Sequence, residues 1–229
     1  MRWVRGVLKS VGAKGIKMSN QDWSKLHELY KGEEWVHRPS IFAETAIEQF
    51  PESGIVLELG AGHGQDSVYF AGKGFQVTAT DLDARALEKT VSELPEELRK
   101  HIKPQAVDLR EPLAFSDGQY DVVYAHLSLH YFDKKTTETL FAELARVLKP
   151  GGILAFLVNS VHDPEYKTGT QLEDDFFDIE GVPKRYFSTD STHNFTKAFE
   201  PIVLDDEGET YKDRAKGVHN LIRYIGRKE

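Results

Sequence analysis

The sequence predicts an α/β fold, a mostly parallel sheet that ends in an antiparallel hairpin. Short aliphatic runs of strand length alternate with segments of helical spacing from residue 55 to residue 158. A glycine-rich turn joins the first strand to the helix after it, and two strand-like segments close the chain without a helix between them. At 229 residues, the chain has room for one such domain and not for two.

Residues 1–17 are basic, because Arg2, Arg5, Lys9, Lys14 and Lys17 are opposed by no acidic residue. With the apolar residues among them, they suit a membrane-surface helix or a transit peptide. They also suit an extension upstream of a domain that begins near Met18. We favour the extension, followed by one domain over residues 18–229.

Residues 18–50 are expected to form a helical cap before the first strand. The spacing around Trp23 is helical, and Pro39-Ser40 introduces a second helix over residues 41–50. The connector between them, residues 30–38, is rich in aromatic and charged side chains. It either forms a lid over the glycine turn or packs on the body of the domain.

The glycine turn follows the strand Ile55–Leu59 and reads Gly60-Ala61-Gly62-His63-Gly64. An ordinary connection between a strand and a helix needs one glycine at most. Glycine adopts positive φ without steric cost and lets a ligand lie against the backbone, and the helix that follows presents unpaired N–H groups. The turn is therefore predicted to bind a ligand.

Acidic residues follow the next two strands. The strand 75–80 ends at Asp81, 17 residues after Gly64, and the strand 102–107 ends at Asp108. A carboxylate in the position of Asp81 binds ribose hydroxyls in nucleotide-type folds. The alternative is that Asp81 caps the helix 83–94, a role that Asp83 can fill instead.

Two histidines, His126 and His130, come directly after the fourth strand, residues 120–125. Open α/β sheets bind ligands at the carboxyl ends of their strands. A metal site is one alternative, but no third ligand and no His-Glu-x-x-His pattern accompanies the pair. We therefore expect no metal and favour histidine as a pocket wall or a proton acceptor.

The second half of the chain first continues the alternation and then departs from it. A helix over 134–149 ends at Pro150-Gly151-Gly152 before a strand over 153–158. Residues 160–187 are expected to form an irregular, lid-like insertion, since a connection of this length is usually functional. Residues 188–229 are expected to form a helix over 188–199 and a hairpin of strands 202–204 and 218–225.

Composition limits the possible functions. The net charge of −8 gives no footprint for binding a phosphate backbone, so a nucleic-acid partner is not expected. The absence of cysteine excludes disulfides and thiolate chemistry. No apolar run is long enough to span a bilayer, and we expect a cytoplasmic protein.

Several motifs together resemble the class I S-adenosylmethionine-dependent methyltransferases, in the order and spacing of that family. They are Glu58-Leu59-Gly60-Ala61-Gly62-His63-Gly64, Thr80-Asp81-Leu82-Asp83, Val107-Asp108-Leu109, residues 120–124 and residues 143–152. The resemblance implies a Rossmann-like, seven-stranded, mostly parallel sheet with helices on both faces. It also implies that residues 54–159 form a core that binds S-adenosyl-L-methionine.

The resemblance further implies roles for single residues. Gly60, Ala61, Gly62 and Gly64 would lie against the cofactor, and Glu58 would hold this loop or the cofactor's amino group. Asp81, beside Leu82, would bind the ribose diol, and Asp108 with Leu109 would meet the adenine. His126 and the stretch to Tyr131 would border the methyl group. If the acceptor must lose a proton, His130 is the first candidate base, followed by His126, Tyr131 and Tyr30.

The predicted function is methyl transfer by in-line displacement to a small-molecule acceptor. Short strings around Gln65 and Phe75 are similar to small-molecule members such as the tellurite-resistance methyltransferases. One rival is an oxidoreductase that uses a nicotinamide cofactor, but Gln65 occupies the third glycine position of the dinucleotide fingerprint. The other rival is a module that binds the cofactor without catalysis.

Overall fold

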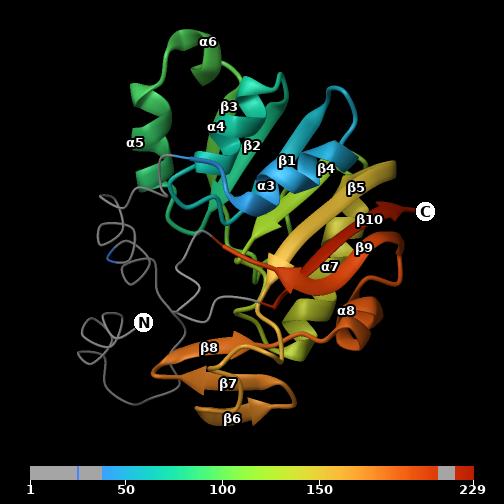
Figure 1. Cartoon of the computed structure of the whole chain (residues 1–229). Coiled ribbons are helices and arrows are strands. Elements are labelled where there is room, and N and C mark those ends of the chain that lie inside the picture. Colours follow the sequence, from blue (N-terminus) through green and yellow to red (C-terminus); the bar gives the residue numbers. More distant parts are fainter. Residues whose placement is uncertain (1–24, 26–37, 211–219) are drawn as a thin grey trace.

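The computed structural model describes Lys25, residues 38–210 and residues 220–229. The basic extension, the helix expected around Trp23 and nearly all of the aromatic connector lie outside these residues. Within them, seven strands form one sheet in the order β3-β2-β1-β4-β5-β10-β9 (Figure 1). The strands are β1 (Ile55–Leu59), β2 (Gln76–Asp81), β3 (Ile102–Ala106), β4 (Tyr120–His126), β5 (Leu148–Val158), β9 (Phe199–Gly208) and β10 (Leu221–Lys228).

The sheet has the predicted mixture of directions. β1 pairs in parallel with β2 on one side and with β4 on the other. β10 runs antiparallel to both β5 and β9. The strand order therefore reverses direction at β1 and β4, and a crevice at such a switch point is where open α/β sheets bind ligands.

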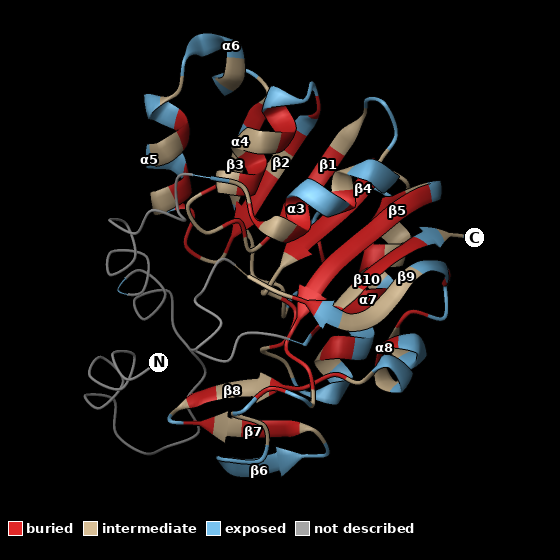
Figure 2. Ribbon diagram, in the orientation of Figure 1, coloured by how far each residue is buried: buried red, intermediate tan, exposed pale blue. Residues whose placement is uncertain are grey.

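Helices cover both faces of the sheet, as predicted. α3 (Ile41–Ala46), with the short 3-10 turn η2 (Ile47–Gln49) after it, α4 (Gln65–Gly72) and α5 (Arg85–Glu93) supply the side chains that cover one face. α7 (Lys134–Val147) and α8 (Thr189–Phe195) supply those on the other, and α6 (Glu96–Arg99) is a single turn before β3. Figure 2 shows the central strands buried along most of their length.

Alternating side chains along each strand explain the two-sided core. In β5, Ile153, Ala155 and Leu157 pack on one face, whereas Leu154, Phe156 and Val158 pack on the other. A strand whose two faces are both buried is continuously apolar, as this segment is. One boundary differs from the prediction, because β5 begins at Leu148 and runs through Pro150-Gly151-Gly152.

The expectation of an irregular insertion at residues 160–187 is wrong. β6 (Thr170–Glu173), β7 (Phe176–Ile179) and β8 (Val182–Arg185) form a separate three-stranded antiparallel sheet, which we call the small sheet. Each strand has only four residues. Runs this short carry too little periodicity to be distinguished from a loop.

The small sheet has its own apolar cluster, formed by Phe177, Ile179 and Tyr186. It lies beyond one end of the main sheet (Figure 1). Its two connections to the main domain run side by side, since the amide of Phe187 donates to the carbonyl oxygen of Asn159 at 2.9 Å. The insertion is therefore a compact unit whose two connections meet, and it also contacts the segment before α7, because the amide of Arg185 donates to the carbonyl oxygen of His130 at 2.7 Å.

Candidate active site

The glycine turn after β1 has left-handed backbone at each of its three glycines. The φ angles are 71° at Gly60, 59° at Gly62 and 84° at Gly64. At Gly60, a Cβ atom would lie 2.3 Å from the Cβ atom of Ser128. Glycine is thus required at this position both by its conformation and by the close approach of Ser128.

Asp81, at the end of β2, holds the glycine turn in place. One carboxylate oxygen accepts a hydrogen bond from the amide of Gly62 at 2.9 Å, and the other accepts from the amide of Asp83 at 3.0 Å. The alternative of a helix cap does not describe this geometry, because the residue that caps α5 is Ala84, with no side-chain bond. The Asp81 carboxylate therefore fixes the backbone of both the turn and the segment after β2.

Asp108 follows β3 and forms an ion pair with Arg110. The guanidinium donates to both carboxylate oxygens, at distances between 2.5 and 3.0 Å. Both side chains are about one third exposed. This pairing raises the pKa of Arg110 and fixes the orientation of the carboxylate.

Glu58 lies beneath the turn rather than in it. Its side chain is buried and accepts a hydrogen bond from the hydroxyl of Ser67, the third residue of α4. Burial raises the pKa of Glu58 well above its ordinary value, and the nearby carboxylate of Asp66 raises it further. The position of Glu58 suits support of the turn, in line with the first of its two predicted roles.

Asp66 connects α4 to the start of α3. Its carboxylate accepts from the amide and the hydroxyl of Ser40, at 2.6 and 2.8 Å, and from the hydroxyl of Tyr124 at 2.8 Å. All three residues are buried. Ser40 also caps α3, so the chain that enters the domain is fixed to the helix that follows the glycine turn.

A cavity of about 530 Å³ opens at this edge of the sheet, within the size range of small-molecule sites. Its first part is the glycine turn with the ends of β2 and β3, lined by Gly60, Gly62, Asp81, Leu82, Val107, Asp108, Leu109, Arg110 and Glu111. Its second part is the entrance to α7 and the small sheet, lined by Leu127, Ser128, Tyr131, Phe132, Asp133, Thr136, Leu172, Phe176, Asp178 and Pro183.

The predicted site residues divide into three groups. Those that line the cavity are Gly60, Gly62, Asp81, Leu82, Asp108, Leu109 and Tyr131. Those that lie outside its lining are Glu58, Ala61, Gly64, His126 and His130. Tyr30 lies outside the described residues. The roles of all of them remain predictions.

His130 is more deeply buried than a pocket wall would be, with 2% of its surface exposed. Its carbonyl oxygen accepts from the amide of Arg185 at 2.7 Å, and its ring centroid lies 4.3 Å from that of Tyr131. His130 therefore contacts the cavity through Tyr131. In the described part of the chain, no three His, Asp or Glu side chains are grouped so as to hold a metal.

No sequence pattern indicated that the small sheet lines the cavity. Leu172, Phe176, Asp178 and Pro183 come from strands that were not predicted, so their shared direction was not predictable. Arg110 was closer to recognition, because a basic residue two positions after a strand-end carboxylate can pair with it.

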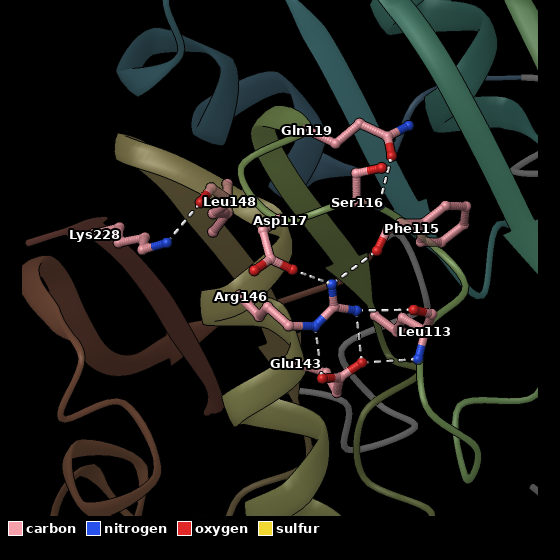
Figure 3. Close-up of polar contacts among 9 residues, drawn as sticks. All are labelled: Leu113, Phe115, Ser116, Asp117, Gln119, Glu143, Arg146, Leu148 and Lys228. Carbon is pink, nitrogen blue, oxygen red and sulfur yellow. Dashed lines mark hydrogen bonds and ion pairs between the residues drawn. The ribbon is translucent and has the colours of Figure 1, made fainter.

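Arg146 of α7 holds the connection between β3 and β4, which begins with the lining residues 107–111. Its guanidinium donates to the carbonyl oxygens of Leu113 and Phe115, both at 2.8 Å, and to the carboxylates of Asp117 and Glu143 (Figure 3). Glu143 in turn accepts from the amide of Leu113 at 2.9 Å. Residues 113–117 of this connection are thus fixed to α7.

The fold and the cavity define a Rossmann-like domain with a ligand site at its switch point. Residues 56–152 match the family model described as a methyltransferase domain. The core of the chain thus matches a methyltransferase domain, in agreement with the resemblance of its motifs to the class I S-adenosylmethionine-dependent methyltransferases.

Among relatives, the chain is similar to an uncharacterized methyltransferase, sll0829, of Synechocystis sp., with 32% identity over 109 residues. The match covers 48% of this chain and 48% of that protein. The chain spans about half the length of the curated relatives it matches.

Solved structures show the same fold. A SAM-dependent methyltransferase of Methanosarcina mazei has a TM-score of 0.67 at 22% identity, over 80% of this chain and 96% of that one. The 1,6-didemethyltoxoflavin-N1-methyltransferase of Burkholderia thailandensis has a TM-score of 0.66 at 17% identity, over 95% and 93%. Among the described residues, no helix has the length and apolarity to cross a membrane.

Proposed function

We propose that the protein binds S-adenosyl-L-methionine and transfers its methyl group to a small-molecule acceptor by in-line displacement. One observation carries this proposal. A single cavity joins the glycine turn and the strand-end carboxylates to a second part that is apolar and aromatic. The first part suits a nucleoside, and the second part suits another molecule beside it.

The residues of the first part fit the adenosyl group chemically. Gly62 lines the cavity with backbone rather than with a side chain, and Asp81, which also lines it, is a carboxylate of the kind that accepts hydrogen bonds from hydroxyl groups. Leu82, Val107 and Leu109 supply apolar surface for a planar base. Asp108, oriented by Arg110, is the polar group beside that surface.

The cofactor supplies a sulfonium, whose methyl group is electrophilic without help from the protein. In-line displacement would pass this methyl group to the acceptor's lone pair, with the thioether of the cofactor as the leaving group. The protein's task is alignment and the exclusion of water. Leu127, Tyr131 and Phe132 supply the water-excluding wall beside the glycine turn.

Tyr131 is the proposed residue beside the acceptor, because it lines the cavity and the two histidines do not. We propose His130 as a residue that positions Tyr131 through their ring contact. Where the acceptor must lose a proton, we propose that the hydroxyl of Tyr131 accepts or relays it. His126 and Tyr30 remain further candidates.

Two structural neighbours support a small acceptor. The Burkholderia thailandensis enzyme was crystallised with 1,6-didemethyltoxoflavin and S-adenosylhomocysteine, and another neighbour is a geranyl diphosphate methyltransferase. One relative at 28% identity is a ribosomal RNA methyltransferase of Alcanivorax borkumensis. The net charge of −8 favours the small molecule over RNA for this chain.

Calorimetry with S-adenosylmethionine and S-adenosylhomocysteine tests the cofactor. We expect binding by the wild-type protein and none by Gly62→Arg, whose side chain would fill the cavity beside Asp81. Absence of binding by the folded wild-type protein would contradict the proposal. Titration with NADH, followed by fluorescence, tests the oxidoreductase rival.

The acceptor is then sought by incubating metabolite extracts with methyl-labelled S-adenosylmethionine, with mass spectrometry of the products. We expect a labelled compound of low molecular mass. Cofactor binding without labelling of any compound would favour the non-catalytic rival.

A further inference from the structure

One face of the small sheet lines the cavity. Along β7, Phe176 and Asp178 line it, whereas Phe177 and Ile179 pack into the small sheet's own cluster. This division follows from the alternation of side chains along a strand. Pro183 of β8 pairs with Asp178 in register and lines the cavity with it.

The cavity side of the small sheet exposes an apolar surface. Leu172 of β6 is 50% exposed. Among the described residues, Leu172 and Ile202 are the two large apolar side chains that are exposed. Because Leu172 also lines the cavity, its exposed surface is available to an apolar ligand. Leu127 and Phe132 add apolar lining in the same part of the cavity, which therefore suits an acceptor with an apolar frame.

Asp178 is the charged group on this apolar face. One of its carboxylate oxygens accepts from the amide of Gly181 at 2.7 Å, in the turn between β7 and β8. That hydrogen bond fixes the carboxylate at the end of a rigid turn. The side chain is half-buried, so its charge is less screened than that of a fully exposed group.

The charges along the cavity exclude an acidic acceptor. Among the described residues that line it, five are acidic: Asp81, Asp108, Glu111, Asp133 and Asp178. Arg110 is the one lysine or arginine of that lining, and it is already bound to Asp108 through both carboxylate oxygens. An anionic acceptor would meet repulsion from Asp178, whereas a cationic group would form a charge-assisted hydrogen bond with it.

From this surface we infer that the acceptor is an amphipathic compound with an apolar frame and a basic nitrogen, and that Asp178 binds the nitrogen in its protonated form. Leu172, Phe176 and Pro183 contact the frame. The inference rests on the proposed function and assigns the substrate class for that site.

The test uses the full chain saturated with S-adenosylhomocysteine, and calorimetry with three probes of similar frame. They are 2-phenylethylamine, 2-phenylethanol and 3-phenylpropanoate, which are cationic, neutral and anionic at pH 7. We expect the amine to bind about ten times more tightly than the alcohol, as one charge-assisted hydrogen bond allows, and the carboxylate to bind most weakly.

Variants test whether the preference for the amine depends on the cavity side of the small sheet. Asp178→Asn retains an oxygen for the amide of Gly181 and should abolish the tenfold preference for the amine. Asp174→Asn is the matched control, because Asp174 is exposed in the turn between β6 and β7 and does not line the cavity. Leu172→Ala should weaken binding of the amine and of the alcohol about equally, by about fivefold. Ile202→Ala, at an exposed leucine-sized residue of β9, should not weaken the binding of either probe.

The outcomes distinguish this inference from the proposed function. Failure of the wild-type protein to bind S-adenosylhomocysteine contradicts the proposed function itself. Binding of S-adenosylhomocysteine with no binding of the amine, with a preference for the carboxylate, or with an unchanged preference in Asp178→Asn contradicts the inference alone.

Discussion

The amide nitrogen of Gly62 donates a hydrogen bond of 2.9 Å to a carboxylate oxygen of Asp81. This contact joins the turn after β1 to the end of β2. Gly62 and Asp81 are 19 residues apart in the chain. The residue proposed to bind the ribose is thus the residue that shapes the glycine turn. A substitution at Asp81 should weaken cofactor binding in two ways, because the ribose loses a hydrogen-bond acceptor and the glycine turn loosens.

Asp81→Ala should weaken binding of S-adenosylhomocysteine by at least about 100-fold, since hydrogen bonds to a charged group contribute about 1.5–3 kcal/mol each. The sheet should remain folded, because the side chain lies at a strand end. Calorimetry measures the affinity and circular dichroism the fold. Asp174→Ala, at an exposed acidic residue outside the cavity, is the control. Unchanged affinity in Asp81→Ala would remove Asp81 from the proposed site.

Arg146→Ala should lower the free energy of unfolding by about 2 kcal/mol, because two carbonyl oxygens and two carboxylates lose one common donor. Arg146→Lys should recover only part of the loss, since an ammonium group cannot reproduce the planar fork. Urea unfolding gives both values. Hydrogen exchange should rise at residues 113–118, and equal exchange in the variant and the wild type would contradict the proposed role.

Glu58 should give stability a distinct pH dependence. Burial and the Asp66 carboxylate raise the folded-state pKa of Glu58 above its ordinary value of 4.5, so the folded protein holds this proton more strongly than the unfolded chain. Its contribution to stability is fully present below about pH 4.5 and is lost as the pH rises through the folded-state pKa.

Glu58→Gln keeps the shape of the side chain without the titration. Relative to the wild type, this variant should therefore gain stability as the pH rises above 4.5. Urea unfolding at pH 5 and pH 8 measures the difference, and Glu88→Gln, at an exposed glutamate of α5, is the control. A constant difference between Glu58→Gln and the wild type across this range would contradict a raised folded-state pKa of Glu58.

Gly60→Ala should destabilise the fold for two separable reasons. The new Cβ atom would lie 2.3 Å from that of Ser128, and φ is 71°. In the double variant Gly60→Ala/Ser128→Gly, the clash is removed and only the conformational cost remains, about 1 kcal/mol. Urea unfolding of both variants and of Ser128→Gly completes the cycle, and additive losses would contradict the clash.

The main sheet was predictable because its signals are local and repeated. The central strands β1, β4 and β5 are largely apolar runs, and the ends of β1 and β2 are marked by Gly60 and Asp81. The helices α4 and α7 have the expected positions because their spacing and end signals agree. The acidic strand ends lie in one cavity because parallel strands end at one edge of a sheet.

The rest of the site depended on contacts that the sequence does not encode locally. The small sheet is held by pairing between strands of four residues, so the position of Asp178 follows from register rather than from a motif. His130 follows a strand end but turns inward, and no pattern of residue types reveals that direction. Arg110 pairs with Asp108, and no motif in the sequence marks that ion pair.

The attachment of the small sheet has a consequence for how this protein can diversify. Asn159 and Phe187 lie side by side, so the 27 residues between them begin and end at nearly one point. An exchange of that segment for one of different length would remove its hydrogen bonds to His130, Phe132 and Lys134 but would leave the bond between Gly62 and Asp81 in place. Under the proposed function, recognition of new acceptors can thus evolve, or be engineered by grafting, while the glycine turn and the strand-end carboxylates are kept.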